Sequence, residues 1–340
     1  MRKEIFFAII TGSLFGLIIA FGVFRANRAL SLKSEVANGD LASPTPSSGN
    51  LTITLAAPEE GDVVTRDTVL VSGITRPKSY VVFSGEEVDY VRSTDHTGAF
   101  EQEVDLISGV NNLTVNVFDS DGNFSDLNVI LVYSSEFGTI LDEMQNPPEE
   151  DSEASPSDSV REAVEQKVQD SLNSPKAYLG TITDISESTL QIKADLGEIQ
   201  QVSVDEEKST IVNVGKTNKE IKFADLAIGD YIIAMGFKNG NNILEAKRVL
   251  VTTAPEEQKR RAVFGEVKTI DTDEETMTIS QADNDVNVVL VKSVEISKLE
   301  DEETNSIDFS DIEEKNLIIA VGSETDGEFE ARSIFVVPKI

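Results

Sequence analysis

The sequence contains no cysteine, no tryptophan and only one histidine in 340 residues. Without cysteine there is no disulfide, no thiolate nucleophile and no cysteine-ligated zinc. The single histidine, His96, precedes a glycine turn in "STDHTGAF", where we expect a solvent-exposed loop. No Walker, Rossmann, G-x-S-x-G or H-E-x-x-H fingerprint is present. We therefore predict no catalytic residues, no bound cofactor and a protein that is not an enzyme.

Basic residues are also scarce. Lysine and arginine together number 29 against 61 acidic residues, which gives a net charge of −32. Such a chain repels the phosphates of nucleic acids, so we expect no nucleic-acid partner. Aromatic side chains make up 6% of the residues, and the lack of tryptophan weakens sugar recognition by stacking. Carbohydrate binding, as an accessory module or part of a glycan-processing enzyme system, stays the alternative function.

The N-terminus carries the one long apolar run, "IFFAIITGSLFGLIIAFGVF" at residues 5–24. At about 1.5 Å per residue it spans a hydrocarbon layer of roughly 30 Å. A cleaved signal peptide is the competing interpretation, but the run continues to Phe24 and arginine follows at once, which favours a retained signal anchor. We predict a single-pass anchor over residues 1–30, with the bulk of the chain outside the cytoplasm.

Gly12 and Gly16 form a GxxxG pair within this run, a pattern through which transmembrane helices associate. Glycines at this spacing are also common in anchors by chance. A homodimer through this pair is therefore kept only as an alternative.

Residues 31–50 are rich in serine, proline and glycine and predict a flexible tether. From Leu51 the pattern alternates between apolar and polar residues, with turn signals at short intervals up to Ser134. Seven or so short strands of this kind predict a β-sandwich over residues 51–134.

The order "P-x-x-G" at 58–61, "VLVSGIT" at 69–75 and "GAFEQEVDLISGVNNLTVNVFDSDGN" at 98–123 resembles bacterial immunoglobulin-like domains of the glucodextranase domain-B type. The resemblance implies an immunoglobulin-like fold in a surface protein, as a spacer or adhesion module. It implies no ligand.

Within that stretch, Asp119, Asp121 and Asn123 have the D-x-D-x-N spacing of a calcium loop. An EF-hand would also need glycine at Phe124 and glutamate at Ile130, and both are missing. A plain hairpin turn is favoured, and a calcium site at these three residues is the alternative. The acidic run at residues 300–308 is interpreted as a solvated loop.

Residues 135–175 change to an acidic linker broken by proline. Inside it, Ser159 and Glu162 have capping-box spacing. Apolar residues four apart follow on one helical face, namely Val160, Val164, Val168 and Leu172. We predict an amphipathic helix at about 159–172, lying on the next domain or forming a small coiled-coil contact between chains.

The remainder of the chain is a duplication. "FADLAIGDYIIAMG" at 223–236 recurs as "FSDIEEKNLIIAVG" at 309–322, and the flanking strands also align. We predict two repeats, 176–252 and 263–340, joined by a linker at 253–262. Strands this short expose edges unless the sheet closes, so each repeat should be a small β-barrel. The repeat resembles an uncharacterised bacterial domain of small tandem β-barrels in exported and membrane-anchored proteins, for which no activity is implied.

Strand alternation places Ile232 and Ala234 on one face of the first repeat and Ile233 and Met235 on the other. Because both faces are apolar, the outer one must be covered, by the partner barrel or by the helix expected at 159–172. A fragment from about Ser174 onwards is expected to fold without the sandwich.

Together these features predict a mainly β, non-enzymatic, membrane-anchored cell-envelope protein. It would present an immunoglobulin-like module and two small barrels outside the membrane for adhesion, spacing or binding to a protein or the cell wall.

Overall fold

The computed structural model describes residues 51–120, 122–145, 174–195, 197–215, 218–255, 259–281, 284–300, 303–325 and 327–339. These residues belong to one compact unit, Asn50–Ile340. The described part is mainly β, as predicted, with one α-helix among its elements. The apolar run at 5–24 and the helix expected at 159–172 lie outside the described residues. Within the described residues, no helix is long and apolar enough to span a bilayer.

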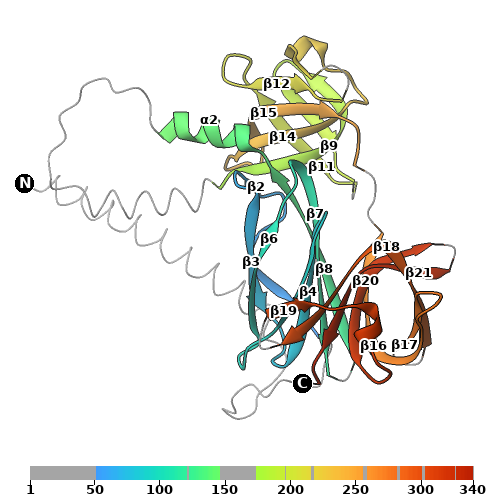
Figure 1. Ribbon diagram of the computed structural model, residues 1–340. Coiled ribbons are helices and arrows are strands. Elements are labelled where there is room, and N and C mark those ends of the chain that lie inside the picture. The colour runs from blue at the N-terminus through green and yellow to red at the C-terminus, as the bar shows by residue number, and fades with distance from the viewer. Residues whose placement is uncertain are drawn as a thin grey trace, which may run out of the picture. The chain divides into compact units, whose positions relative to one another are not determined.

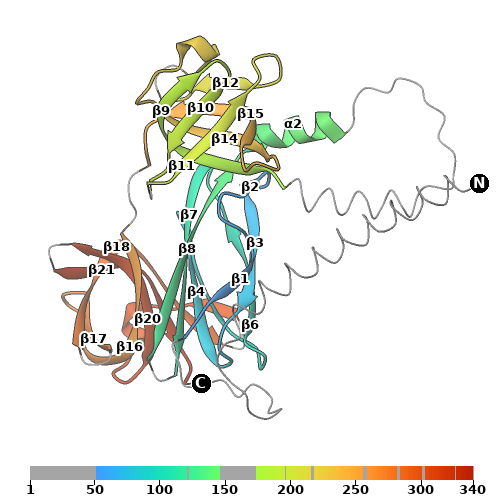
Figure 2. The ribbon, with the colours of Figure 1, turned by 180° about the vertical axis from the view of Figure 1, so that it is seen from behind.

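The first eight strands, called here the first module, form two sheets (Figures 1 and 2). Their order is β1-β3-β6 in one sheet and β2-β8-β7-β4-β5 in the other. The strands are β1 Thr54–Ala57, β2 Val63–Val64, β3 Thr68–Ile74, β4 Ser79–Ser84, β5 Asp89–Ser93, β6 Ala99–Asp105, β7 Gly109–Asp119 and β8 Phe124–Tyr133.

The core of the first module lies between its two sheets. In β6, Phe100 and Val104 point inward while Glu101 and Glu103 face solvent, as the alternating pattern predicts. The ring of Phe100 meets that of Phe83 from β4, with centroids 5.8 Å apart in an edge-on arrangement. The sandwich interpretation therefore agrees with the packing.

A helix that the sequence reading missed follows directly on β8. Helix α2, Ser135–Gln145, begins where the Phe137 amide donates to the Ser134 hydroxyl oxygen at 3.2 Å, an N-terminal cap. Its Phe137, Ile140 and Leu141 share one face and pack into an apolar cluster. The sequence predicts a linker here because the acidic, proline-containing residues that follow dominate the composition of 135–175.

The next group of strands, called copy 1, forms a sheet that closes on itself. The ring runs β11-β10-β9-β14-β15, and β11 pairs again with β15 to close it. The elements are β9 Lys176–Ser186, β10 Thr189–Lys193, β11 Ile199–Val204, β12 Thr210–Asn213, β13 Lys219–Glu220, the 3-10 turn η1 Phe223–Asp225, β14 Tyr231–Lys238 and β15 Leu244–Thr252.

The last group, copy 2, closes in the same way. Its ring is β17-β16-β20-β21-β18. One long strand, β18, occupies the positions that β11 and β12 occupy in copy 1. The elements are β16 Arg260–Asp271, β17 Thr276–Gln281, β18 Asn284–Glu300, β19 Glu303–Ser306, the 3-10 turn η2 Phe309–Asp311, β20 Leu317–Thr325 and β21 Glu328–Val337.

The repeated phrase occupies the same place in both copies. Each begins with a 3-10 turn whose aspartate, Asp225 or Asp311, accepts a hydrogen bond from the backbone three residues before it. Each ends at a bulge, where Gly236 and Gly322 pass so close to the neighbouring strand that a Cβ would lie 2.0 Å from a carbonyl oxygen. The backbone therefore kinks at the same position of the repeated phrase in both copies.

The interior of each ring is filled by apolar side chains. Ile232 and Ala234 belong to the core of copy 1, and Ile318 and Ala320 to that of copy 2. The face that carries Ile232 and Ala234, and its equivalent in copy 2, is therefore the inner one. The described elements that cover the outer face are given below.

Candidate functional site: a locked turn and two docking surfaces

The turn at Asp119 is a hairpin between β7 and β8. The Asp119 carboxylate is buried and accepts hydrogen bonds from the Asn123 amide nitrogen at 2.9 Å and from the Asn123 side chain. It also pairs with Arg76. Asp121 lies outside the described residues. The Asp119 oxygens are thus committed to holding the turn, which agrees with the plain-turn interpretation. Among the described residues, no group of three histidine, cysteine or acidic side chains could hold a metal.

Two other sequence candidates lie at the surface. His96 is exposed in the loop between β5 and β6, as predicted. The acidic run at 300–308 is not a plain loop, because Glu303–Ser306 forms strand β19 paired with the end of β18. All four residues of that strand are exposed, so the expectation of a solvated segment holds while the expectation of a loop was wrong.

Copy 1 docks on the first module through the outer face of β14. Tyr231, Ile233 and Met235 pack in one apolar cluster with Val63 of β2 and Val132 of β8. Phe137 of α2 belongs to the same cluster, and its ring centroid lies 6.4 Å from that of Phe237. The outer face is therefore covered by the first module and α2, and the cluster contains no residue of the other barrel.

Backbone pairing adds to this docking surface. The Val63 amide donates to the Pro175 carbonyl at 3.1 Å, and the Ala177 amide donates to the Gly61 carbonyl at 2.7 Å. Gly61 has a φ of +72°, and a Cβ there would lie 2.8 Å from the Ala177 oxygen. Only glycine fits this close approach without strain.

One lysine anchors the charged part of the same surface. The Lys176 ammonium donates to Glu59 and to Asp62, both at 2.6 Å. Although burial works against its charged form, these two hydrogen bonds raise the pKa of Lys176 above its ordinary value. The hydrogen bond from Lys176 in turn lowers the pKa of Glu59. The pair is therefore charged across the neutral range.

Copy 2 docks elsewhere on the first module but uses the equivalent strand. Ile319 and Val321 of β20 pack with Tyr80, Val82 and other residues of β4, β5 and β7 in a second apolar cluster. The Phe264 ring of β16 lies between two rings of the first module, with centroids 5.3 Å from Phe118 and 6.2 Å from Tyr80. The Tyr80 hydroxyl donates to the Pro338 carbonyl oxygen, and burial raises the pKa of Tyr80 to about 12.

Two arginines anchor the charged part of the second surface. Arg332 forms a forked pair with Asp89, through Nε at 2.9 Å and Nη2 at 2.5 Å, and Ser333 donates to the same carboxylate at 2.7 Å. Arg260 pairs with Glu86 at 2.9 Å. Burial lowers the pKa of Arg260, opposed by the nearby Glu86 charge.

The two docking surfaces share one design. In each barrel, the outer face of the repeated strand packs against the first module. The cations of each barrel pair with an E-E-x-D segment of that module. That segment is "EEGD" at 59–62 for copy 1 and "EEVD" at 86–89 for copy 2. In both, the first and last acids of the segment receive the cations of the barrel. The arrangement holds each barrel against the first module through these ion pairs.

Comparison with known proteins gives little. No family model and no curated protein matches the chain. A solved structure described as Drosophila Unr CSD456 is 11% identical, covers 77% of this chain and 97% of its own, and has a TM-score of 0.17. A bacterial ice-binding adhesin of 1.5 MDa, studied for host cell surface retention, is 10% identical, with coverages of 84% and 96% and a TM-score of 0.19. A Ca²⁺-stabilized adhesin of an Antarctic bacterium is 13% identical, with coverages of 86% and 75% and a TM-score of 0.18. At such TM-scores these likenesses carry no argument about this chain.

Proposed function

We propose that this is a non-enzymatic, membrane-anchored protein of the cell envelope that presents a rigid three-part head outside the membrane. In the proposal, residues 51–134 are an immunoglobulin-like sandwich of the kind the sequence resembles. Residues 176–252 and 263–340 are two small barrels mounted on it. The head serves adhesion, spacing or binding of a protein or cell-wall partner, and residues 5–24 are its anchor.

The observation that supports this function is the double docking. Modules that are joined only by flexible linkers bury little surface against one another. Here Ile233 and Ile319 are both buried on the outer sides of their barrels, and the side chain of Asp89 is completely buried in its pair with Arg332. Burying an ion pair costs desolvation, which good geometry offsets. Such contacts are suited to holding the two barrels at fixed positions.

The filled interiors of the two barrels also support this proposal. The side chains of Leu190, Ile192 and Leu244 occupy the core of copy 1, and Ile279, Val288 and Phe329 occupy that of copy 2. Closed small barrels bind a ligand inside only where the interior is left open. The surfaces that the head offers to a partner are therefore its outer ones.

The absence of cysteine allows one direct experiment. Single cysteines replace the exposed Glu220 in copy 1 and the exposed Glu328 in copy 2, and the buried Val71 serves as the matched control. On intact cells, a membrane-impermeant maleimide should label Glu220→Cys and Glu328→Cys, and Val71→Cys only after denaturation. Labelling that requires cell lysis would overturn the extracytoplasmic location.

The same two cysteine positions, combined in one variant, test whether the head is rigid. Spin labels on the double variant Glu220→Cys/Glu328→Cys should give a single narrow distance distribution by pulsed electron paramagnetic resonance. A distribution as broad as that of a flexible tether would contradict a rigid head.

A further inference from the structure

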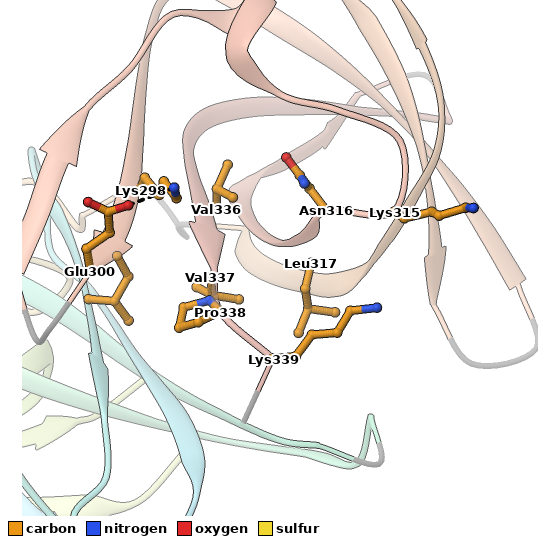
Figure 3. A pocket seen from close by; sticks show the side chains of 10 residues that line it. Lys298, Glu300, Lys315, Asn316, Leu317, Val336, Val337, Pro338 and Lys339 are labelled. Atoms are coloured by element: carbon orange, nitrogen blue, oxygen red, sulfur yellow. Dashed lines mark ion pairs between the residues drawn. The ribbon is translucent and has the colours of Figure 1, made fainter.

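A groove opens at one end of copy 2, where the end of β18, the start of β20 and the end of β21 meet (Figure 3). Its volume is about 700 Å³, and Leu317, Val336 and Pro338 contribute apolar surface. Three lysines, Lys298, Lys315 and Lys339, also line it. Figure 3 shows Lys298 beside Glu300 on one side, and Lys315 and Lys339 extending on the other. Three lysines among ten lining residues are many for a chain with 29 basic residues in 340.

The duplication shows that these lysines belong to copy 2 alone. Lys298 pairs with Val336 across β18 and β21 in the same register in which Asn213 pairs with Val251 in copy 1. The aligned sequences place Gly229 opposite Lys315 and Ala254 opposite Lys339. The residues of copy 1 at the three positions are thus Asn213, Gly229 and Ala254. The same fold therefore forms without these cations, and the fold does not account for them.

Lys315 also adopts a backbone conformation that a side chain disfavours. Its φ is +71°, where copy 1 has Gly229 at +97°. A residue with a Cβ in the left-handed region raises the energy of the folded chain, a penalty that glycine avoids. Lys315 is exposed and has no ion-pair partner among the described residues. Neither turn geometry nor an ion pair within the described chain explains a lysine at this position.

The other two lysines have partners that a ligand can replace. Lys298 pairs with Glu300 at 2.7 Å and Lys339 with Glu266 at 3.2 Å, and all four side chains are about half exposed or more. Exposed pairs of this kind contribute little and exchange readily. Glu300 makes the groove mixed in charge, which disfavours a dense polyanion and provides an acceptor for an N–H group. A peptide carries carboxylates, apolar side chains and N–H groups together.

We propose that this groove binds a short, extended acidic segment of a partner protein, with apolar side chains set between its carboxylates. The ammonium groups of Lys298, Lys315 and Lys339 receive the carboxylates, and Leu317 and Pro338 contact the apolar side chains. The site deepens the proposed function, on which it rests, by naming a class of partner for the head. Its test uses purified protein, so its outcome does not depend on which side of the membrane the head occupies.

The experiment measures fluorescence anisotropy of a labelled pentapeptide of alternating glutamate and leucine, with the full-length protein in detergent. The triple variant Lys298→Asn/Lys315→Gly/Lys339→Ala installs the residues of copy 1. The control, Lys193→Ala/Lys219→Ala/Lys222→Ala, removes three exposed lysines of copy 1 and changes the net charge equally. We expect the triple variant to bind roughly tenfold more weakly and the control to bind like the parent. A glutamine-for-glutamate peptide should lose binding to a similar degree.

Three results would overturn the proposal. The first is no binding of the acidic peptide by the parent below about 1 mM. The second is an equal loss in the control, which would mean only long-range attraction. The third is tight binding of polyphosphate in place of the peptide, which would mark a site for an inorganic polyanion. Because copy 1 folds with the substituted residues, the triple variant should fold. If its circular dichroism differs from the parent, Lys315→Gly alone, which relieves the left-handed strain, provides the comparison.

Discussion

The two barrels are built on one plan yet are held to the first module by interactions of different character. Copy 2 uses arginines, and the carboxylate of Asp89 that receives Arg332 is 0% exposed. Copy 1 uses a lysine, and the side chain of its partner Glu59 is 77% exposed. Copy 1 compensates with strand-like backbone pairing at Gly61 and with the apolar face of α2. Both surfaces therefore contain an apolar cluster and ion pairs, and they differ in what is added: a fully buried carboxylate in copy 2, and backbone pairing together with α2 in copy 1.

The choice of cation follows from this difference. A guanidinium offers a planar fork that satisfies a buried carboxylate with two parallel bonds, whereas an ammonium is a compact, strongly hydrated charge. At Asp89, where water is excluded, the fork of Arg332 fits. At Glu59 and Asp62, near solvent, one ammonium bridges two acids without needing complete burial.

The largest expected effect is the difference in stability between substitutions on the inner and on the outer face of the repeated strand. Ile232→Asp and Ile318→Asp each place a carboxylate inside a filled barrel, so each should unfold its own copy at a cost above roughly 3 kcal/mol. Ile233→Asp and Ile319→Asp bury a carboxylate only in the docked state, so their barrel should undock and stay folded.

Urea melts followed by circular dichroism, combined with limited proteolysis of the linkers, distinguish the two outcomes in the chain from Asn50 onwards. Undocking should expose the linker to protease before β-structure is lost. If Ile319→Asp abolishes the β signal of copy 2 as fully as Ile318→Asp does, docking and barrel folding are one event.

A smaller effect compares the two charged anchors. Asp89→Asn leaves Arg332 and Ser333 facing a neutral group in a buried site, and we expect a loss of roughly 3 kcal/mol in the free energy of unfolding. Asp62→Asn leaves Lys176 its second partner, Glu59, whose side chain is 77% exposed, so its loss should be smaller, at about 1 kcal/mol. The urea midpoints of the two isosteric variants measure the difference, and equal losses would mean that burial does not distinguish the anchors.

Much of this architecture could be predicted because it is local or repeated. Alternation located the strands, and the duplicated phrase located both barrels. Apolar residues on both faces of the repeated strand correctly predicted that the outer face is covered. The plain turn at Asp119 agrees with its D-x-x-G-N pattern, since Asn123 binds back to Asp119.

What the sequence did not reveal depends on contacts between distant segments. No local pattern pairs Arg332 with Asp89, because the two residues meet only after both modules have folded. For the same reason the partner barrel was wrongly expected to cover Ile233, while the helix expected at 159–172 lies outside the described residues. Helix α2 could have been predicted from the sequence. Ser134 stands at a capping position, and Phe137, Ile140 and Leu141 follow at the spacing of one helical face. The independent folding of residues 174–340 stays a prediction, now with the expectation that two apolar outer faces would be exposed.

The smallest expected effect concerns two adjacent acids in the segment that docks copy 1. The hydrogen bond from Lys176 lowers the pKa of Glu59, whereas partial burial raises the pKa of Glu60, whose carboxylate accepts from the Ile130 amide. A lowered pKa gives stability that is present above the unfolded value of 4.5 and is lost as the pH falls through the folded pKa. A raised pKa has the opposite consequence, and its contribution is lost as the pH rises through the folded pKa.

Glu59→Gln and Glu60→Gln should therefore show opposite pH dependence, each by less than about 1 kcal/mol. Relative to the parent, Glu59→Gln should become less stable as the pH rises from 3.5 to 6, an interval that includes the reference value of 4.5 for both groups, while Glu60→Gln should become more stable. Urea midpoints of the chain from Asn50 onwards, measured across this interval, give the two slopes. Parallel slopes would show that Lys176 does not engage Glu59 in solution, and the charged anchor of copy 1 would then rest on Asp62 alone.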